Sequence, residues 1–509
     1  MIFQIPYNST GFFSPIIDDY LKGDSYLHNL VNHFPELENF EKQINEKRKQ
    51  KVDRELLCNL LSKQNQGINL SKLSNQNILS IKDENTFTVT TGHQLCLITG
   101  PLYFFYKIIS TINLCEELKN KYPKYKFVPI FWMATEDHDF EEINHINIFK
   151  KTFRWMTNQK GAVGRMSLNG IDSVLKDLQG ILYKGKHSKS LNEILNNAYL
   201  KNNTLSQATR SIVNDLFGKY GLVILDADNK KLKQLFVTQI KKDILENAFC
   251  SSIRNSTEFI EKKYSSQAQI SKINFFKLGD QVREKIKETV NAEIIEKFPE
   301  NFSPNVLLRP LYQEKILPNI AYVGGGAEIS YWMQLKQMFK QENVPFPILV
   351  LRNSALIMQK KHFDDFQSLG FSLKDLFRGS EDLKNDYIKR KLSYKVSLKK
   401  EKEELVKIYD NIALKSDHKN FVLNLNIQLK KNINILDQIE KKLIKNHKSQ
   451  NDVSLRKIQK IKDLYFPNGK LQERHLNFVP FYLDSGDNFI KILKDNLTPL
   501  NTNFLLLTV

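Results

Sequence analysis

Two apolar runs, separated by a stretch with helical spacing, form the clearest pattern in the chain. Residues 86–91 are β-branched and aromatic, as is typical of a strand. Residues 127–134 (FVPIFWMA) are almost continuously apolar, as expected for a strand buried on both faces. Between them, Pro101 favours a helix start, and residues 104–119 continue as a helix. This order predicts a βαβ unit with two parallel strands.

Further apolar runs extend the predicted sheet. Residues 221–228 (GLVILDAD) are typical of a buried strand. Asp226 and Asp228 at its end are expected either to bind a ligand at the sheet edge or to stabilise a turn. Residues 305–311 are predicted as a short strand, and residues 347–351 as another buried strand. We therefore expect an open, mainly parallel α/β sheet.

A triple glycine lies between an apolar segment and a helix. Residues 320–323 are apolar, Gly324, Gly325 and Gly326 follow, and residues 327–339 have helical spacing. Consecutive glycines let the backbone approach a ligand closely, and the N–H groups at a helix start suit an anion. The segment is predicted as an anion-binding turn or as a tight turn without a ligand.

Changes in composition divide the chain around this core. Polar stretches interrupt the predicted strands at two places, and glycine becomes rare after about residue 380. The predicted segments are a helical N-terminal region (1–85), a first half of the core (86–150), a first insertion (151–210), a core strand (211–230), a second insertion (231–300), a second half of the core (301–380), a coiled-coil arm (381–463) and a C-terminal return to the core (464–509). In the last segment, residues 478–483 are predicted as a strand and residues 488–497 as a helix.

Apolar positions in the predicted arm repeat every three to four residues. Leu405 and Ile412 are seven residues apart, and a second series runs from Val422 to Leu443. Such heptads predict two long helices that form an antiparallel coiled coil. Residues 384–463 contain 21 Lys or Arg and 10 Asp or Glu, a surplus that we interpret as a solvated helix face in preference to a nucleic-acid surface.

The composition is that of a soluble protein with a basic surface. The 509 residues carry a formal net charge of +19, and 41% are hydrophobic, so the chain can bury a large core and attract anions. The four cysteines form no CxxC pair, which disfavours a zinc ribbon or a disulfide framework. No signal-peptide pattern and no apolar run of about 18 residues is present. We therefore expect a cytoplasmic protein with no membrane partner.

Polar side chains follow both strands of the predicted βαβ unit. Gly92-His93-Gln94 comes after the first, and residues 135–145 (TEDHDFEEINH) come after the second. Because ligands of open α/β sheets bind at the carboxyl ends of the strands, we expect both stretches to face one ligand. The carboxylates could position an amine, act as a general base or hold Mg²⁺ with a nucleotide. His93 is expected to donate to a phosphate or to make a capping contact.

Several well-known site patterns are absent from the chain. It contains no HExxH zinc pattern, no GxxxxGK[ST] phosphate loop, no GxGxxG after the first strand and no GxSxG nucleophile turn. A zinc hydrolase, a P-loop NTPase, a dinucleotide enzyme and an α/β-hydrolase are therefore disfavoured. No metal site built from protein side chains is predicted.

Four segments in order along the chain carry a family resemblance. They are TTGHQLCLITGPLYFFYKI, VPIFWMATEDHDFEEINH, LLRPLYQEKILPNIAYVGGGAEISYW and LYFPNGKLQER. Together they resemble the bacillithiol synthase family, the cysteine ligases of bacillithiol biosynthesis. The resemblance implies a Rossmann-like nucleotidyltransferase core similar to class I aminoacyl-tRNA synthetases, two helical insertions and a coiled-coil arm that forms a homodimer.

The same resemblance implies a reaction. Cysteine would be joined through its carboxyl group to the amine of glucosaminyl-malate, which gives bacillithiol. Amide formation from a free carboxylate is uphill in water, so an activated cysteine carboxylate is expected. ATP with Mg²⁺ would fit such a fold, while the resemblance leaves the activating cofactor open. The lysine loop KMSKS of the synthetases is missing, and many family members have Gln at the position of His93.

The resemblance and the strand-end rule together give a set of expected site residues at the sheet edge. Asp137, His138 and Asp139 are predicted to position the amine or act as the base, with His93 as a further catalytic residue. The predicted binding residues for substrate or nucleotide are Thr91, Gly92, Gln94, Thr99, Gly100, Glu136, Arg309, Gln313, Gly324, Gly325, Gly326, Glu328, Tyr331 and Trp332.

Two other functions fit parts of the pattern. An RNA-binding protein related to the synthetases would hold a tRNA-like partner on the basic arm, and its affinity would fall steeply with salt. We regard nucleic acid as the less favoured partner. A nucleotidyltransferase that acts on another small molecule would share the fold.

Overall fold

The computed structural model describes residues 1–149, 151–183, 185–391 and 397–508. Its centre is a five-stranded sheet in the order β11-β10-β2-β3-β6, and every neighbouring pair is parallel. The strands are β2 (Thr86–His93), β3 (Lys126–Met133), β6 (Val223–Asp226), β10 (Asn319–Gly324) and β11 (Ile348–Leu351). The predicted parallel α/β sheet is confirmed, and α5 (Tyr103–Lys121) makes the crossover from β2 to β3.

Strand β3 is buried on both faces, which accounts for its continuous apolar sequence. Ile130 and Trp132 belong to a core shared with the N-terminal helices, whereas Phe131 and Met133 belong to a core shared with α5. Because successive side chains of a strand point to opposite faces, each face demands its own apolar residues. Each buried side chain of this size stabilises the fold by about 1.5–3 kcal/mol.

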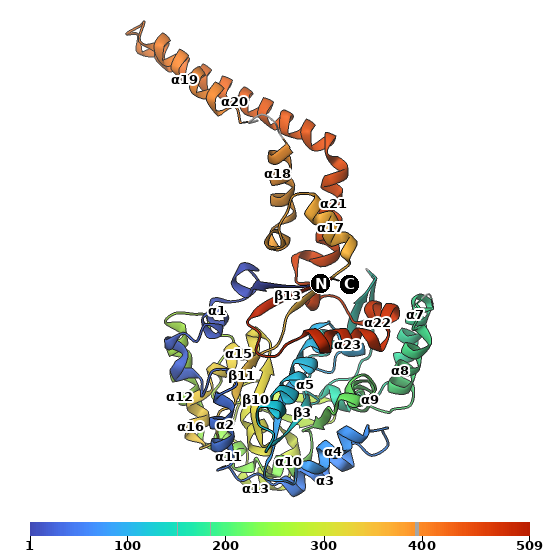
Figure 1. Ribbon diagram of the computed structural model, residues 1–509. Coiled ribbons are helices and arrows are strands. Elements are labelled where there is room, and N and C mark those ends of the chain that lie inside the picture. Colours follow the sequence, from blue (N-terminus) through green and yellow to red (C-terminus); the bar gives the residue numbers. More distant parts are fainter. Residues whose placement is uncertain (150, 184, 392–396, 509) are drawn as a thin grey trace.

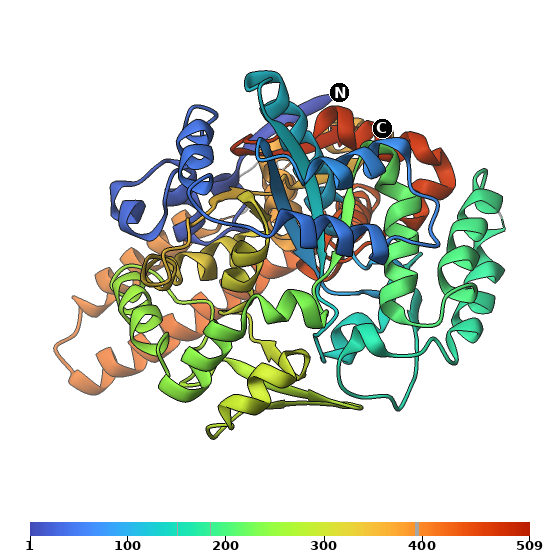
Figure 2. The ribbon, with the colours of Figure 1, turned by 90° about the horizontal axis from the view of Figure 1, so that it is seen from below.

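Helices and two inserted segments surround the sheet. The N-terminal helices are α1 (Pro15–Leu21), α2 (Asn39–Lys47), α3 (Arg54–Gln64) and α4 (Lys72–Ser80). The first inserted segment begins before the predicted residue 151. It contains α6 (Phe140–Ile143), the hairpin β4 (His145–Ile148) and β5 (Lys151–Arg154), α7 (Ile171–Leu182) and α8 (Ser188–Leu200), and α9 (Leu205–Phe217) returns to the sheet. The second insertion contains α10 (Lys230–Gln234), α11 (Val237–Glu246), α12 (Cys250–Glu261), β7 (Phe275–Gly279), β8 (Val282–Lys285), α13 (Ala292–Lys297) and β9 (Phe302–Pro304). The two insertions lie on opposite sides of one end of the sheet (Figure 2).

Two predicted strands are helices in the structure. Residues 305–311 are not a strand, because Asn305 Oδ1 accepts hydrogen bonds from the Leu307 and Leu308 N–H groups and turns the chain into α14 (Arg309–Ile316). Residues 478–483 form most of α22 (Val479–Ser485), which also has a proline in its first turn. The backbone N–H groups in the first turn of a helix have no acceptor within the helix, so proline, which lacks an N–H, is tolerated there. It therefore favours a helix start over a central strand. The predicted helix over 488–497 is confirmed as α23 (Asp487–Asn496).

The predicted helix after the triple glycine is broken in two. It comprises α15 (Gly326–Met333) and α16 (Lys336–Gln341). The break falls at Gln334 and Leu335, and the Gln334 side-chain amide donates hydrogen bonds to Thr257 and to the Ala268 carbonyl, at 2.9 and 3.1 Å. These bonds tie α15 to the second insertion.

A second, smaller sheet joins the two ends of the chain. Strand β1 (Ile2–Pro6) pairs antiparallel with β13 (Asn503–Thr508), and β12 (Ala355–Met358) pairs parallel with β13. The N- and C-termini therefore lie together near the base of the arm (Figure 1). None of these three strands was predicted, because their pairing depends on contacts between residues far apart in sequence, such as Ile2 with Leu507 and Ala355 with Leu505.

The arm projects away from the core as an antiparallel helix pair (Figure 1). After α17 (Lys360–Ser368) and α18 (Ser380–Lys391), it consists of α19 (Lys399–Ala413) and α20 (Lys419–Gln450), and α21 (Asp452–Tyr465) returns to the core. Asn432 donates to the Tyr409 hydroxyl at 2.7 Å, and Lys402 pairs with Glu440 at 2.6 Å, which fixes the antiparallel register and confirms the predicted coiled coil. Within the described ranges, no helix combines the length and the apolar character that crossing a bilayer requires.

Candidate functional site

A cavity of about 660 Å³ opens where β2, β3 and β10 end. Eight of the predicted site residues line it, together with residues of α5 and of the second insertion. The predicted residues are Gly92, His93, Gln94, Glu136, Asp137, Arg309, Glu328 and Tyr331. This convergence follows from the sheet, because parallel strands deliver their carboxyl ends to one edge.

A larger hollow of about 830 Å³ lies between α12 and α16, away from the strand ends. Its lining residues in the described ranges include no carboxylate. We place the candidate site in the smaller cavity, because it lies at the strand ends and an imidazole, carboxylates and a guanidinium line it together.

His93 is a neutral imidazole at the end of β2. Its Nδ1 lies 2.8 Å from the Gln94 carbonyl oxygen, so Nδ1 carries the proton and donates, which leaves Nε2 as the acceptor. Burial, with a further contribution from the Lys107 charge, lowers the pKa of His93 from 6.5 to about 4. Donation to a phosphate, as predicted from the sequence, would need the charged ring. The geometry instead equips His93 to accept a hydrogen bond from a ligand.

The buried neutral state of His93 predicts a pH-dependent stability. The unfolded state binds a proton at His93 below pH 6.5, whereas the native state binds it only below about pH 4. The contribution of His93 to stability is therefore complete above pH 6.5 and is lost as the pH falls to 4. The expected loss from this group is about 3 kcal/mol. Urea unfolding at pH 7 and pH 5 should show a larger decrease for the wild type than for His93→Gln. Equal decreases in the two proteins would contradict the assignment.

Gln94 and Asp137 form the next part of the wall. Gln94 Nε2 donates to Asp137 Oδ2 at 2.9 Å and to Glu142 Oε2 at 2.8 Å. Asp137 Oδ1 accepts from the His138 N–H at 2.7 Å. Burial raises the pKa of Asp137, but the Gln94 and His138 hydrogen bonds and the Arg283 charge outweigh it, so the net pKa is lowered. Asp137 is therefore an ionised carboxylate facing the cavity.

The other two residues of the predicted catalytic group have different surroundings. His138 Nδ1 lies 2.8 Å from Arg283 Nη1, and because a guanidinium only donates, Nδ1 accepts in this contact. Asp139 is the N-cap of α6, where Oδ1 accepts from the Glu142 N–H at 3.4 Å. Neither is among the residues that line the cavity. The structure thus separates Asp137 from its two neighbours.

A largely buried ion pair in the cavity wall joins Glu328, which was predicted, to Lys107, which was missed from the sequence. Lys107 Nζ lies 2.8 and 2.9 Å from the two Glu328 carboxylate oxygens and also contacts the Gly92 carbonyl. Glu328 further accepts from the Tyr322 hydroxyl at 2.6 Å and from the Gly325 N–H at 2.9 Å. Burial raises the pKa of Glu328, but these partners outweigh it and hold the pKa at about 2. The available signal was that Lys107 is the only charged residue of α5 before Glu116.

The triple glycine shapes the pocket without lining it. The Gly325 N–H is taken by Glu328, and Gly324 accepts a backbone hydrogen bond from Arg352 at 2.9 Å. A Cβ at Gly326 would lie 3.3 Å from Ile17, so the turn packs tightly against α1. The N–H of Gly325 is therefore directed to a protein carboxylate in this turn, and an anion-binding role of the triple glycine stays a prediction.

Arg309 is a half-buried cation whose Nη2 donor atom is itself buried. Its guanidinium lies over the rings of Trp132 and Tyr322, at 5.6 and 5.3 Å, and Nη1 donates to Gln313 at 2.9 Å. Among the described residues, its buried Nη2 atom has no partner in hydrogen-bond geometry, although the Tyr331 side chain lies near the guanidinium and interacts with it. An orphaned buried donor of this kind is costly unless a ligand satisfies it, so Arg309 is suited to an anionic ligand group.

The remaining predicted residues support the wall from behind. Thr91 Oγ1 donates to the Val323 carbonyl at 2.8 Å and ties β2 to β10. Thr99 and Gly100 have positive φ angles in the turn before α5, and a Cβ at Gly100 would lie 2.7 Å from that of Cys96. Gln313 orients Arg309, and Trp332 stacks on Tyr322 at 4.5 Å. Thr91, Thr99, Gly100, Gln313 and Trp332 are not among the residues that line the cavity.

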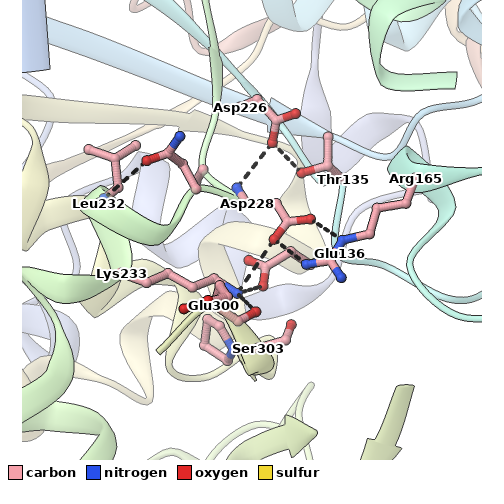
Figure 3. A network of polar contacts seen from close by, with 12 residues as sticks. Thr135, Glu136, Arg165, Asp226, Asp228, Leu232, Lys233, Glu300 and Ser303 are labelled. Atoms are coloured by element: carbon pink, nitrogen blue, oxygen red, sulfur yellow. Dashed lines mark hydrogen bonds and ion pairs between the residues drawn. The ribbon is translucent and has the colours of Figure 1, made fainter. Parts of the chain in front are cut away.

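A second polar network closes the β3–β6 side of the edge (Figure 3). Arg165 donates to both Asp228 oxygens at 2.7 and 2.8 Å, and Lys233 contacts Glu136 and lies 3.7 Å from Asp228. Asp226 Oδ1 accepts from Thr135 at 2.6 Å and from the Asp228 N–H at 3.0 Å. The two aspartates thus brace the loop as turn and ion-pair residues. No group of three or more His, Cys, Asp or Glu side chains arranged for a metal ion occurs in the described part of the chain.

Comparison with known proteins gives matches over both halves of the chain. A family model described as “Bacillithiol biosynthesis BshC, N-terminal Rossmann-like domain” matches residues 1–353, and one described as “Bacillithiol biosynthesis BshC, C-terminal coiled-coil domain” matches residues 355–509. Relatives from Flavobacterium johnsoniae and Flavobacterium psychrophilum are each 42% identical, over 99% and 98% of both chains respectively. A relative from Bacillus mycoides is 26% identical over 93% of this chain and 94% of its own. All three bear the name “Putative cysteine ligase BshC”.

Proposed function

This chain belongs to the BshC family of bacillithiol biosynthesis, and from that premise we propose that it is a ligase that joins the carboxyl group of L-cysteine to the amine of glucosaminyl-malate. One observation supports this proposal best. An ionised carboxylate, Asp137, and a guanidinium with an orphaned donor, Arg309, line the same cavity at the sheet edge. A reaction between an amine and a carboxyl group needs a site of each kind.

In this proposal each polar group has a defined task. Arg309 Nη2 binds the carboxyl oxygen of cysteine, where its charge stabilises the negative charge that develops as the amine attacks. Asp137 holds the acceptor amine and takes the proton that this nitrogen loses as the carbon–nitrogen bond forms. His93 Nε2 accepts a further hydrogen bond from the same substrates. A nucleoside triphosphate would transfer a phosphoryl or nucleotidyl group to the cysteine carboxyl group, so that one carboxyl oxygen would leave with the phosphate when the amine attacks.

The direct test is a reaction followed by mass spectrometry. The protein is incubated with cysteine, glucosaminyl-malate and each nucleoside triphosphate in turn, with and without Mg²⁺. We expect a product whose mass equals both substrates minus one water, in the presence of at least one nucleotide. No amide product in any mixture, with both substrates recovered intact, would refute the proposed function.

We further propose that two copies of the chain associate through the arm. Within the described residues, neither α19 nor α20 buries a single side chain, and Ile435, Ile439 and Leu443 form an exposed apolar stripe four residues apart along α20. Ile439 and Leu443 were predicted for the seam between the two helices. Their exposure leaves an apolar face that a second copy could cover.

Breaking this stripe is expected to give a monomer. Ile435→Glu/Ile439→Glu places two charges on the apolar face, whereas Lys430→Glu makes the same net change in charge at another exposed position of α20. Light scattering after gel filtration should give about twice the chain mass of 59.5 kDa for the wild type and for Lys430→Glu. The double variant should give the chain mass. A wild-type protein that elutes as a monomer would contradict the proposal.

A further inference from the structure

The hairpin β7–β8 of the second insertion forms one wall of the cavity. Phe276 pairs with Lys285 and Leu278 pairs with Arg283 across the antiparallel hairpin, so these four side chains share one face. Phe276, Arg283 and Lys285 line the cavity. Lys277 is exposed on the other face and does not line it.

Arg283 is held firmly on this wall without a carboxylate partner. Its guanidinium stacks on the Phe276 ring at 3.9 Å, and it donates to His138 at 2.8 Å and to Ser303 at 3.4 Å. Lys285 Nζ donates to Ser271 Oγ at 2.7 Å. These neutral partners fix the directions of the two cations. Neither cation forms an ion pair within 4.0 Å in the described ranges, although Arg283 still interacts with the Asp137 charge at longer range.

The cations around the cavity therefore fall into two groups. Lys107, Lys233 and Arg165 each lie within 4 Å of a carboxylate, in pairs that brace the loops. In the portion of the chain that the structure covers, no such pair is formed by Arg283, Lys285 or Arg309. A cavity lined by three unpaired cations attracts a ligand that brings several negative charges.

We propose that Arg283 and Lys285 form a dicarboxylate subsite that binds the malyl end of the acceptor, an inference that rests on the proposed function. Charge matching supports the assignment: cysteine brings one carboxylate, for which Arg309 suffices, and glucosaminyl-malate brings two. The position of the hairpin supports it too, because Lys285 is exposed and so lies where the larger substrate enters. The planar guanidinium of Arg283 binds one carboxylate through two parallel hydrogen bonds, and Lys285 binds the other.

Steady-state kinetics separates this subsite from a general effect. Arg283→Gln and Lys285→Gln should each raise the KM for glucosaminyl-malate by about 10- to 100-fold, as expected for the loss of one charge-assisted hydrogen-bonding partner. The KM for cysteine should stay within about twofold in both variants. Lys277→Gln removes the same charge from the opposite face of the hairpin and should leave both constants unchanged. A rise in the KM for cysteine instead would overturn the proposal.

Direct binding tests the subsite without the reaction. In calorimetric titrations, malate should bind the wild type and Lys277→Gln, and its affinity should fall at least tenfold in Lys285→Gln, whose side chain is exposed and whose fold is not at risk. ADP titrated in parallel identifies a phosphate site: if Lys285→Gln weakens ADP and leaves malate unchanged, the dicarboxylate assignment is overturned. Failure of malate to bind the wild type overturns it as well, whereas failure to form amide with malate bound refutes only the ligase reaction.

Discussion

Asp137→Asn should lower kcat/KM for amide formation by about 10²- to 10⁴-fold, the range expected when a group that accepts a proton in the transition state is removed. The substitution keeps an oxygen to accept from Gln94 and removes the negative charge that holds the amine. Because shape and hydrogen bonding are nearly preserved, the melting temperature should change little. The measurement is the initial rate of product formation by mass spectrometry, alongside thermal unfolding.

Glu141→Gln is the matched control for this prediction. Glu141 lies shortly after Asp137, in α6, but it is exposed, pairs with Arg154 at 2.8 Å and does not line the cavity. Its loss should leave kcat/KM unchanged. If Asp137→Asn instead retains activity within about threefold of the wild type, Asp137 has no role in proton transfer or in holding the amine.

The parts of this site that lie at strand ends were predictable from the sequence. Residues 127–134 are apolar on both faces, so the strand was evident, and its carboxyl end had to carry the Glu136 and Asp137 side chains to the sheet edge. The same argument brought Gly92, His93 and Gln94 to that edge. Strand position fixes where a side chain starts, however, and not where it points, so Asp137 could not be distinguished from His138 and Asp139.

Residues on helices and inserted hairpins were missed for physical reasons. Lys107 lies in the apolar face of α5, and only the folded arrangement reveals Glu328 from α15 as its partner, 221 residues further along the chain. Arg283 and Lys285 occur in a polar connector whose charges resemble any solvated loop in sequence. The sequence pattern before Pro310 was also misleading. Residues 305–311 were predicted as a strand, but the turn at Asn305 leads into α14 instead.

Removing either member of the Lys107–Glu328 pair should destabilise the protein by about 3–5 kcal/mol, because it leaves a buried charge without its partner. The Lys107 side chain is 4% exposed and that of Glu328 is 26% exposed, so water can solvate an unpaired Lys107 less than an unpaired Glu328. Glu328→Gln should therefore cause the larger loss. Urea unfolding, followed by the fluorescence of Trp132 and Trp332 beside the cavity, measures it.

A double variant separates the charge from the packing. Lys107→Met/Glu328→Gln removes both charges and should lose less stability than the sum of the two single variants. The Glu328 contribution should also depend on pH: since its pKa falls from 4.5 to about 2 on folding, the contribution is complete above pH 4.5 and is lost as the pH drops toward 2. A loss below about 1 kcal/mol for Glu328→Gln would contradict this account. The ion pair anchors the end of β2 through the Gly92 carbonyl. The double variant should still fold. It should form amide more slowly, because His93 and Gln94 would lose the fixed positions that the ion pair gives them.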